Sequence, residues 1–390
     1  MDALAREGAR FPGAVAPVPL TLPSHASILT GLDPARHGVR ANGAVFPEGV
    51  ATLSELLGRE GWATGAVVSG YPLRAEFGLD RGFGSYDDRL PQGPGGAWAK
   101  RPAPDSATAG LAFVSRQEAA EPGRPWFLWI HFYDPHDPYA PPARLRHEGD
   151  RGGYDGEVAF VDEAIGALER ALANRGRRRE LLTVFAADHG ESLGEHGEAT
   201  HGFFVYDATV LVPLAFRWPG RIAPREIRAP ARLVDVSPTV LDLLGLAVPR
   251  GLDGRPLAPL LDGSASAWDG ALVESFQPWL GYGWAPLRAF RKDGWKLIDA
   301  PRPELYDLAA DAAEERDRHA AEPRRAAVLR RALEDALARP PVSSVAQGAA
   351  PDDAERQRQL RSLGYLGGSV SASAPFPADA ADPKDRLAMR

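Results

Sequence analysis

The chain has 390 residues, with 45 lysines and arginines against 52 aspartates and glutamates, and therefore a formal net charge of −7. This acidic balance excludes a typical nucleic-acid-binding protein, because such proteins need clustered positive charge against phosphates. The sequence has no cysteine, which excludes disulfides, thiolate metal ligands and cysteine nucleophiles. It has no apolar run of about 18 residues, so we expect no transmembrane segment, and Met1–Val15 lacks the layout of a signal peptide.

The first segment with a chemical signal is Pro19–Gly31, which contains Thr21, Pro23, Ser24 and His25. Pro23 fits the first position of a helix, with Thr21 just before it. The free N–H groups and the dipole at a helix start favour an anion, so Thr21 can serve as a nucleophile toward a phosphate or sulfate. The alternative is that Thr21 or Ser24 only caps the helix, and this segment taken alone favours the cap.

Short apolar runs alternate with helical patterns along the rest of the chain. The predicted buried strands are Ala66–Ser69, Trp126–Phe132, Leu181–Ala186, Leu214–Arg217 and Ala271–Phe276, with a short extended piece at Pro303–Leu308. The predicted helices are Glu157–Ala173, Asp235–Leu244, Ala321–Ala338 and Glu355–Leu363. This alternation predicts an α/β fold with a mainly parallel central sheet flanked by helices, in which ligands bind at the carboxyl ends of strands.

Seven of the nine histidines fall in three short clusters, the first of which contains His25 and His37. The second cluster, His131 and His136, follows a predicted strand. Alternating prolines around Asp134 and His136 fix an extended loop and hold His136 at the carboxyl edge of a sheet. The alternative is a rigid turn in which these side chains satisfy only backbone groups.

The third cluster also follows a predicted strand and contains Asp188, His189, Glu191, His196 and His201. An adjacent aspartate and histidine at a strand end can both bind a divalent cation, one through oxygen and the other through nitrogen. Acidic residues and histidines between glycines are more typical of a metal loop than of a packed core. The sequence therefore favours a metal site here over a structural turn.

These motifs resemble the sulfatase branch of the alkaline phosphatase superfamily. Thr21–His25, with Thr30–Gly31 and His37–Val39 after it, is similar to the family's nucleophile motif, commonly Cys-x-Pro-Ser-Arg. Asp134–His136 resembles the loop that carries a catalytic histidine, and Asp188–Glu191 resembles the metal loop. The resemblance covers roughly residues 1–335 and keeps the motif order of the family.

The resemblance implies a sulfatase-like α/β fold with a small C-terminal subdomain, and metal-dependent hydrolysis of a sulfate, phosphate or phosphonate ester. It implies that Thr21 is both the nucleophile and a metal ligand, and that Asp188 and His189 are further metal ligands. His25, His136 and His201 would be catalytic residues that contact the anion or protonate the leaving group. Asn42 would bind the substrate. The implied cofactor is a divalent cation, Ca, Mg, Mn or Zn. The implied partner is a small anionic ester, and relatives are often periplasmic or membrane-anchored.

One departure from the family concerns the N-terminus. Family members begin with a strand that ends in paired aspartates, two metal ligands, upstream of a stretch resembling Asp2–Gly8. We expect this strand to be missing here, either because the true start lies upstream of Met1 or because the protein is a truncated form. Two carboxylates bring most of the charge that holds a hard cation, so the alternative function is a catalytically impaired, non-catalytic scaffold of the same fold.

The second departure is the nucleophile itself. Sulfatases oxidise a cysteine or serine to an aldehyde hydrate, whose sulfate ester breaks down by elimination. Thr21 carries a β-methyl group, so its oxidation would give a ketone instead. A plain threonine sulfate has no comparable release route, whereas a threonine phosphoester is opened by in-line attack of water, so the nucleophile favours phosphate or phosphonate esters.

The expected domains are a sulfatase-like catalytic domain that lacks its first strand, a C-terminal subdomain, and a flexible tail with one short helix. Their expected bounds are residues 1–264, 265–338 and 339–390. The boundary of the tail rests on tracts rich in proline, serine and alanine, which are typical of linkers.

Overall fold

The computed structural model describes residues 1–93, 98–149, 151–264, 269–342, 354–362 and 379–386. They form two compact units, which we treat one at a time. The first contains Met1–Gly8, Ala51–Thr183 and Phe216–Pro224, and the second contains Ala9–Val50, Val184–Ala215 and Arg225–Arg390. Most of the predicted tail lies outside the described residues. Among the helices that are described, none combines the length and the apolarity needed to cross a bilayer.

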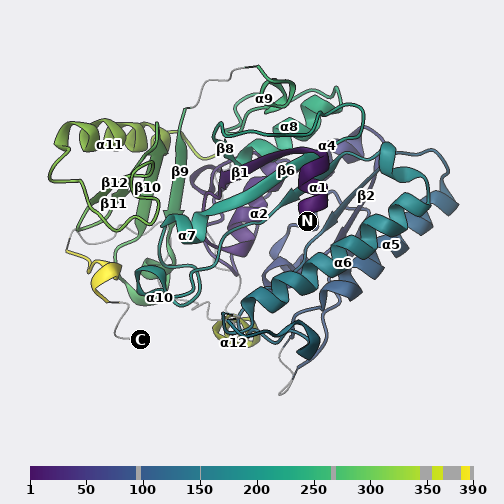
Figure 1. The fold of residues 1–390 in the computed structure, drawn as a ribbon, viewed down its shortest axis with the longest axis horizontal. Coiled ribbons are helices and arrows are strands. Elements are labelled where there is room, and N and C mark those ends of the chain that lie inside the picture. The colour runs from purple at the N-terminus through teal and green to yellow at the C-terminus, as the bar shows by residue number, and fades with distance from the viewer. Residues whose placement is uncertain (94–97, 150, 265–268, 343–353, 363–378, 387–390) are drawn as a thin grey trace. The chain divides into compact units, whose positions relative to one another are not determined.

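The first unit is built on a parallel three-stranded sheet with helices packed against it (Figure 1). The strands, in sheet order, are β3 (Ser85–Asp87), β2 (Ala63–Val67) and β4 (Trp126–Ile130). The α-helices are α1 (Asp2–Glu7), α4 (Leu53–Arg59), α5 (Ala103–Ala120) and α6 (Tyr154–Asn174). α5 and α6 pack side by side, and α5 also packs on β2 and β4 through apolar residues such as Phe113.

The second unit contains a five-stranded sheet in the order β5-β6-β1-β7, with β8 also paired to β1. The strands are β5 (Thr183–Ala186), β6 (Leu211–Arg217), β1 (Ala9–Val15), β7 (Arg225–Glu226) and β8 (Ala231–Arg232). β1 runs parallel to both of its short partners, pairing at Ala9–Arg10 with β7 and at Ala14–Val15 with β8. Pro12 lies between these two pairings, which explains how a strand interior tolerates a residue without an N–H.

A four-stranded antiparallel sheet forms the C-terminal part of the second unit (Figure 1). Its strands, in sheet order, are β12 (Glu304–Asp307), β11 (Trp295–Asp299), β10 (Leu287–Lys292) and β9 (Ala271–Ser275). α11 (Pro323–Leu337) packs across it, and Leu329 and Leu333 join Leu297 and Leu305 in one apolar cluster. This sheet and its helix confirm the predicted small C-terminal subdomain of an α/β fold.

The remaining helices of the second unit are short. The α-helices are α2 (Thr21–Thr30), α3 (Pro34–His37), α7 (Asp207–Val210), α8 (Val236–Leu243), α9 (Ala258–Asp262), α10 (Gln277–Tyr282) and α12 (Ala354–Ser362). α2 packs against α3 and α8. All of the predicted strands and helices correspond to observed elements, but β4 and β5 are partly exposed along their whole length rather than buried. Each of these two strands lies at the edge of its sheet, where one side has no neighbouring strand in that sheet.

Asp33, which precedes α3, should make the free energy of unfolding depend on pH. Its side chain is buried beside Asp253, and burial, followed by the charge of Asp253, raises the pKa of Asp33 to about 7. At Asp33 the folded state therefore binds more of a proton than the unfolded state between about pH 4 and pH 7, and the contribution of Asp33 to stability falls as the pH rises through this window.

We expect Asp33→Asn to remove this dependence. At about pH 8 the free energy of unfolding of the variant should exceed that of the wild type by on the order of 1 kcal/mol. At about pH 5 the difference should be smaller. Denaturant melts at both pH values measure the difference, with the exposed Asp242→Asn as the control. Parallel pH profiles for wild type and Asp33→Asn would show that Asp33 does not titrate in this range.

Candidate active site

The predicted nucleophile lies at the first residue of α2. The helix begins at Thr21, so the prediction that it begins at Pro23 is wrong by two residues. Its first backbone hydrogen bond runs from Ser24 N to Leu20 O at 3.1 Å. Pro23 is tolerated because the N–H groups of the first helical turn have no partner within the helix. Thr21 is 1% exposed.

The alternative that Thr21 or Ser24 caps this helix is also wrong. The residue at the cap position is Leu20, and no side-chain cap is formed from it. Leu22 N donates instead to Asn42 Oδ1 at 2.8 Å, and Ser24 Oγ donates to Asp188 O at 2.6 Å. The Thr21 hydroxyl is therefore not engaged in holding the helix start.

His189 approaches this hydroxyl directly. Thr21 Oγ1 and His189 Nε2 are 3.5 Å apart. On the other side of the ring, Nδ1 donates to Gly190 O at 2.8 Å, which fixes the tautomer and presents the Nε2 lone pair toward Thr21. Asp188 Oδ2 also lies 3.5 Å from His189 Nε2. Two of the predicted metal ligands, Thr21 and Asp188, thus each lie close to the third, His189.

His25 lies one helical turn after Thr21 and faces the same carboxylate. Its Nδ1 donates to Thr21 O at 2.9 Å and lies 3.5 Å from Asp188 Oδ2. Burial lowers the pKa of His25, although the Asp188 charge opposes this effect. The neutral imidazole is therefore favoured beside the nucleophile.

His201 packs against His189, with the two ring centres 4.2 Å apart. Its Nδ1 donates to Glu191 Oε1 at 3.0 Å. Burial, followed by the neighbouring His189, holds the pKa of His201 well below its ordinary value. His201 is therefore neutral, with its proton on Nδ1 and the lone pair on Nε2.

Asn42 presents an unused donor at the same helix start. Because Oδ1 accepts from Leu22 N, the orientation of the amide is fixed and its NH₂ group points away from that bond. Asn42 is 8% exposed, and its Nδ2 is buried with no hydrogen-bond partner among the described residues. Such a donor suits an anion bound at the start of α2.

His136 belongs to the first unit, as do the neighbours described next. Its backbone N donates to Glu157 Oε2 at 3.1 Å, and the Tyr133 ring stacks on the imidazole with centres 4.3 Å apart. Lys100 forms ion pairs with Glu157 and with Asp134, the latter at 3.1 Å. The proline-rich loop is therefore held by a largely buried charge network that includes Glu157 and Lys100, which no sequence motif had indicated.

The other clustered histidines have structural roles. His37 bonds Ser27 Oγ at 2.9 Å, and burial lowers the pKa of His37 to about 3. His131 Nδ1 accepts from Ser69 N at 3.3 Å, within the first unit. His196 stacks on Tyr206 with ring centres 3.5 Å apart.

The donor atoms around Thr21 fit part of a metal site. Thr21 Oγ1 and Asp188 Oδ2 each lie 3.5 Å from His189 Nε2, close to the separation of about 3–3.4 Å between neighbouring ligands bound to one cation at about 2.0–2.4 Å. In the part of the chain that the structure describes, no three His, Asp or Glu side chains are grouped so that they could hold a metal ion. These residues therefore fit one face of a coordination shell, not a complete one.

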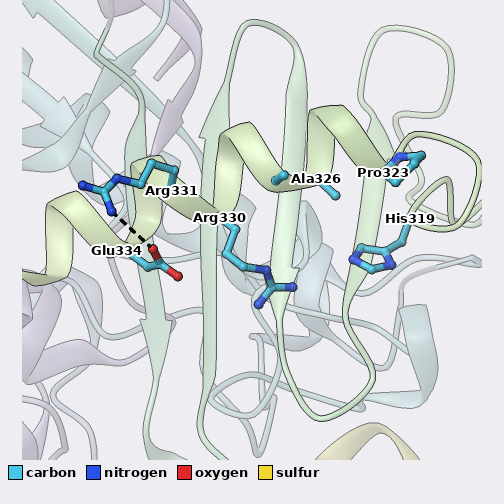
Figure 2. Close-up of a pocket in the computed structure, with 7 residues that line it drawn as sticks. His319, Pro323, Ala326, Arg330, Arg331 and Glu334 are labelled. Carbon is cyan, nitrogen blue, oxygen red and sulfur yellow. Dashed lines mark ion pairs between the residues drawn. The ribbon is translucent and has the colours of Figure 1, made fainter.

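A groove of about 430 Å³ runs along α11 and is shown in Figure 2. It is lined by His319, Pro323, Ala326, Ala327, Arg330, Arg331 and Glu334. Arg330 pairs with Asp299, and Arg331 pairs with Asp335 at 3.1 Å and with Glu334 at 4.0 Å. Because its cationic groups are already neutralised, this groove has no chemical features comparable to those around Thr21.

Comparisons with known proteins agree with the motifs. The family model described as "Sulfatase" matches residues 1–246, and that described as "N-sulphoglucosamine sulphohydrolase, C-terminal" matches residues 194–339. Choline-sulfatase of Rhizobium meliloti is 27% identical over an alignment of 399 residues, covering 80% of this chain and 76% of the relative. Arylsulfatase A of Homo sapiens is 26% identical over 320 residues, covering 68% of this chain and 63% of the relative, so the chain spans less than two thirds of that protein.

Solved structures share the fold. One, determined in complex with its substrate D-glucosamine-2-N,6-O-disulfate, has a TM-score of 0.73 at 20% identity, covering 86% of this chain and 91% of that chain. The phosphonate monoester hydrolase of Agrobacterium radiobacter has a TM-score of 0.69 at 22% identity, covering 86% and 89%. The predicted fold class is confirmed, and the chain belongs to the sulfatase family of sulfuric ester hydrolases, within the alkaline phosphatase superfamily.

Proposed function

We propose that this chain hydrolyses a small anionic ester with Thr21 Oγ1 as the nucleophile, and that it prefers phosphate or phosphonate esters to sulfate esters. The observation that carries the proposal is the position of this hydroxyl. It is buried at the first residue of α2, takes no part in capping, and lies 3.5 Å from His189 Nε2. Family membership supports the reaction class, and the chemistry of threonine supports the preference.

The anion would bind at the start of α2. The dipole and the free N–H groups of this ten-residue helix favour negative charge there. Asn42 Nδ2 adds a buried donor, and His25 lies beside the nucleophile. These groups are fixed before substrate binds, so they can stabilise the charge that develops in the transition state without reorganising.

Sulfatase-family enzymes typically use a divalent metal ion. Here Thr21, Asp188 and His189 would hold it, with the remaining ligands supplied by other groups. A bound cation supplies positive charge that lowers the pKa of a hydroxyl and neutralises an anionic ester.

In the first step, Thr21 Oγ1 attacks the phosphorus as its proton passes to His201 Nε2, and the bond from phosphorus to the leaving oxygen breaks. We assign protonation of that oxygen to His201, which is neutral at the start and carries the proton taken from Thr21. In the second step, water attacks the phosphothreonine and gives a proton to His201 Nε2, the bond from phosphorus to Thr21 Oγ1 breaks, and that proton passes on to Oγ1. Glu191 stabilises the imidazolium that forms, because it already accepts from Nδ1 at 3.0 Å.

A direct test compares two esters with the same leaving group. With a divalent cation present, we expect kcat/KM for 4-nitrophenyl phosphate or for a 4-nitrophenyl phosphonate to exceed that for 4-nitrophenyl sulfate by at least about 10-fold, because a threonine sulfate lacks an easy release route. The shared leaving group removes differences in its basicity. A preference for the sulfate ester with Thr21 intact would contradict the argument.

The second candidate function is a non-catalytic scaffold with the sulfatase fold. One observation favours it: among the described residues, no three His, Asp or Glu side chains are grouped to hold a metal ion. Calorimetric titration with Ca²⁺, Mg²⁺, Mn²⁺ and Zn²⁺ separates the two functions. Failure to bind any of these cations, together with no turnover of any of the three esters, would favour the scaffold.

A further inference from the structure

The segment that follows His201 connects the candidate site to α10. Gly202 has a φ of +108°, and a Cβ atom at this position would lie 3.3 Å from Leu20 Cδ2 and 3.9 Å from Gln277 Cγ. Ser275 Oγ donates to Gly202 O at 2.5 Å. Gly202 therefore lies between the residue that precedes the nucleophile and the first residue of α10.

A pair of stacked aromatic side chains extends from this segment. The Tyr282 and Trp284 rings have centres 4.4 Å apart and planes inclined by 17°. The Phe203 ring lies 5.6 Å from Tyr282 and 6.3 Å from Trp284. Phe203 is 2% exposed, whereas Tyr282 and Trp284 are each partly exposed. The pair is thus anchored on a buried ring only two residues beyond His201 and keeps accessible ring surface.

Gln277 adds a polar group at the same place. It is 3% exposed, and its Nε2 is buried without a hydrogen-bond partner in the described part of the chain. Leaving a buried amide donor unpaired is unfavourable, and such groups call for an explanation such as a bound ligand. Accessible aromatic surface beside a few fixed polar donors is typical of small-molecule sites.

We propose that Tyr282, Trp284 and Gln277 form a subsite for the leaving group of the ester. This subsite takes a leaving group with a flat apolar ring face, either aryl or pyranose, which stacks on the aromatic pair. Gln277 Nε2 donates a hydrogen bond to an oxygen of that group. The assignment rests on the proposed function, because in a phosphate monoester the leaving group is the only part that can carry a ring.

The kinetic experiment compares phenyl phosphate and glucose 6-phosphate with methyl phosphate. In Trp284→Ala and Tyr282→Ala, kcat/KM should fall by about 10-fold or more for at least one of the ring esters and much less for methyl phosphate, while Trp284→Phe should recover most of the loss. Trp295→Phe, on β11 outside this cluster, is the control. An equal loss for all three esters would indicate a structural role, and no loss for either ring ester would also overturn the proposal.

A binding experiment separates this inference from the proposed function, since it needs no turnover. Calorimetry should give a dissociation constant for phenylphosphonate, or for glucose 6-phosphate in the inactive Thr21→Ala background, at least about 10-fold below that for methylphosphonate, and Trp284→Ala should remove the difference. A ring preference without turnover would support the subsite and count against the proposed catalysis. Turnover without any ring preference, or no binding of either ring ligand, would overturn the subsite.

Discussion

Thr21→Ala should lower kcat for a phosphate ester by more than about 1,000-fold, because the side chain that would form the covalent intermediate is gone. Thr21→Ser, which keeps the hydroxyl, should stay within about 10-fold of the wild type. Since the Thr21 hydroxyl does not cap α2, the alanine variant should unfold within about 1 kcal/mol of the wild type. Steady-state kinetics and denaturant melts measure both effects.

Thr30→Ala provides the matched control at the other end of the same helix. Thr30 Oγ1 donates to Ala26 O at 2.7 Å and accepts from Leu32 N at 3.2 Å, so its hydroxyl is structural. This variant should lose about 1 kcal/mol of stability and keep its kcat. Full activity in Thr21→Ala would mean that another residue is the nucleophile, with the nearby Ser24 as the next one to replace.

Asp188→Asn should raise the dissociation constant for a divalent cation by at least about 10-fold and lower kcat/KM by about 100-fold or more, because it removes the carboxylate charge next to His189 Nε2. The substitution keeps the shape of the side chain, and the Ser24 Oγ bond goes to the backbone of Asp188, so the fold should be retained. Titration calorimetry measures the affinity independently of turnover.

Glu191→Gln is the control for this prediction. Glu191 accepts from His201 Nδ1, and His201 is not one of the assigned cation ligands, so the loss of the Glu191 charge should slow the reaction and leave cation affinity close to that of the wild type. Unchanged cation affinity in Asp188→Asn would contradict the assignment of Asp188 as a ligand.

The sequence predicted best those elements whose apolar pattern is local. β4 and β5 are short apolar runs that end in polar motifs, so both the strands and the loops after them, with His136 and with Asp188 and His189, were predicted. β1 was not predicted, because Pro12 and Gly13 interrupt its pattern and only the staggered pairing with β7 and β8 makes room for them.

Other elements were missed for different physical reasons. α5 is rich in alanine, serine and threonine, without a clear apolar period, and its helix is stabilised by packing on β2, β4 and α6. The turn of the β10–β11 hairpin, by contrast, has a recognisable sequence. Asp293 and Gly294 both have positive φ, as a tight hairpin turn requires, and an Asp-Gly pair is a common sequence for such a turn.

Sequence motifs identified the residues of the candidate site, but they could not predict which of these side chains contact each other. Thr21 and His189 are 168 positions apart, and no periodicity predicts that their side-chain atoms lie 3.5 Å from each other. The sequence likewise could not predict that Leu22 N donates to Asn42 Oδ1. Without this bond, a cap formed by Thr21 or Ser24 was the favoured hypothesis. Local patterns identify reactive residue types, whereas the pairing of donors with acceptors depends on tertiary structure.

If Thr21 is the nucleophile, it carries a covalent phosphate during turnover, and rapid-quench mass spectrometry detects this intermediate. The wild type is mixed with cation and a phosphate ester and quenched within a turnover, and the tryptic peptide Phe11–Arg36 is sequenced. We predict phosphate on Thr21 in the wild type and none in Thr21→Ala. Phosphate on another residue of the peptide, such as Ser24, or turnover without any phosphorylated peptide, would show that Thr21 is not the nucleophile.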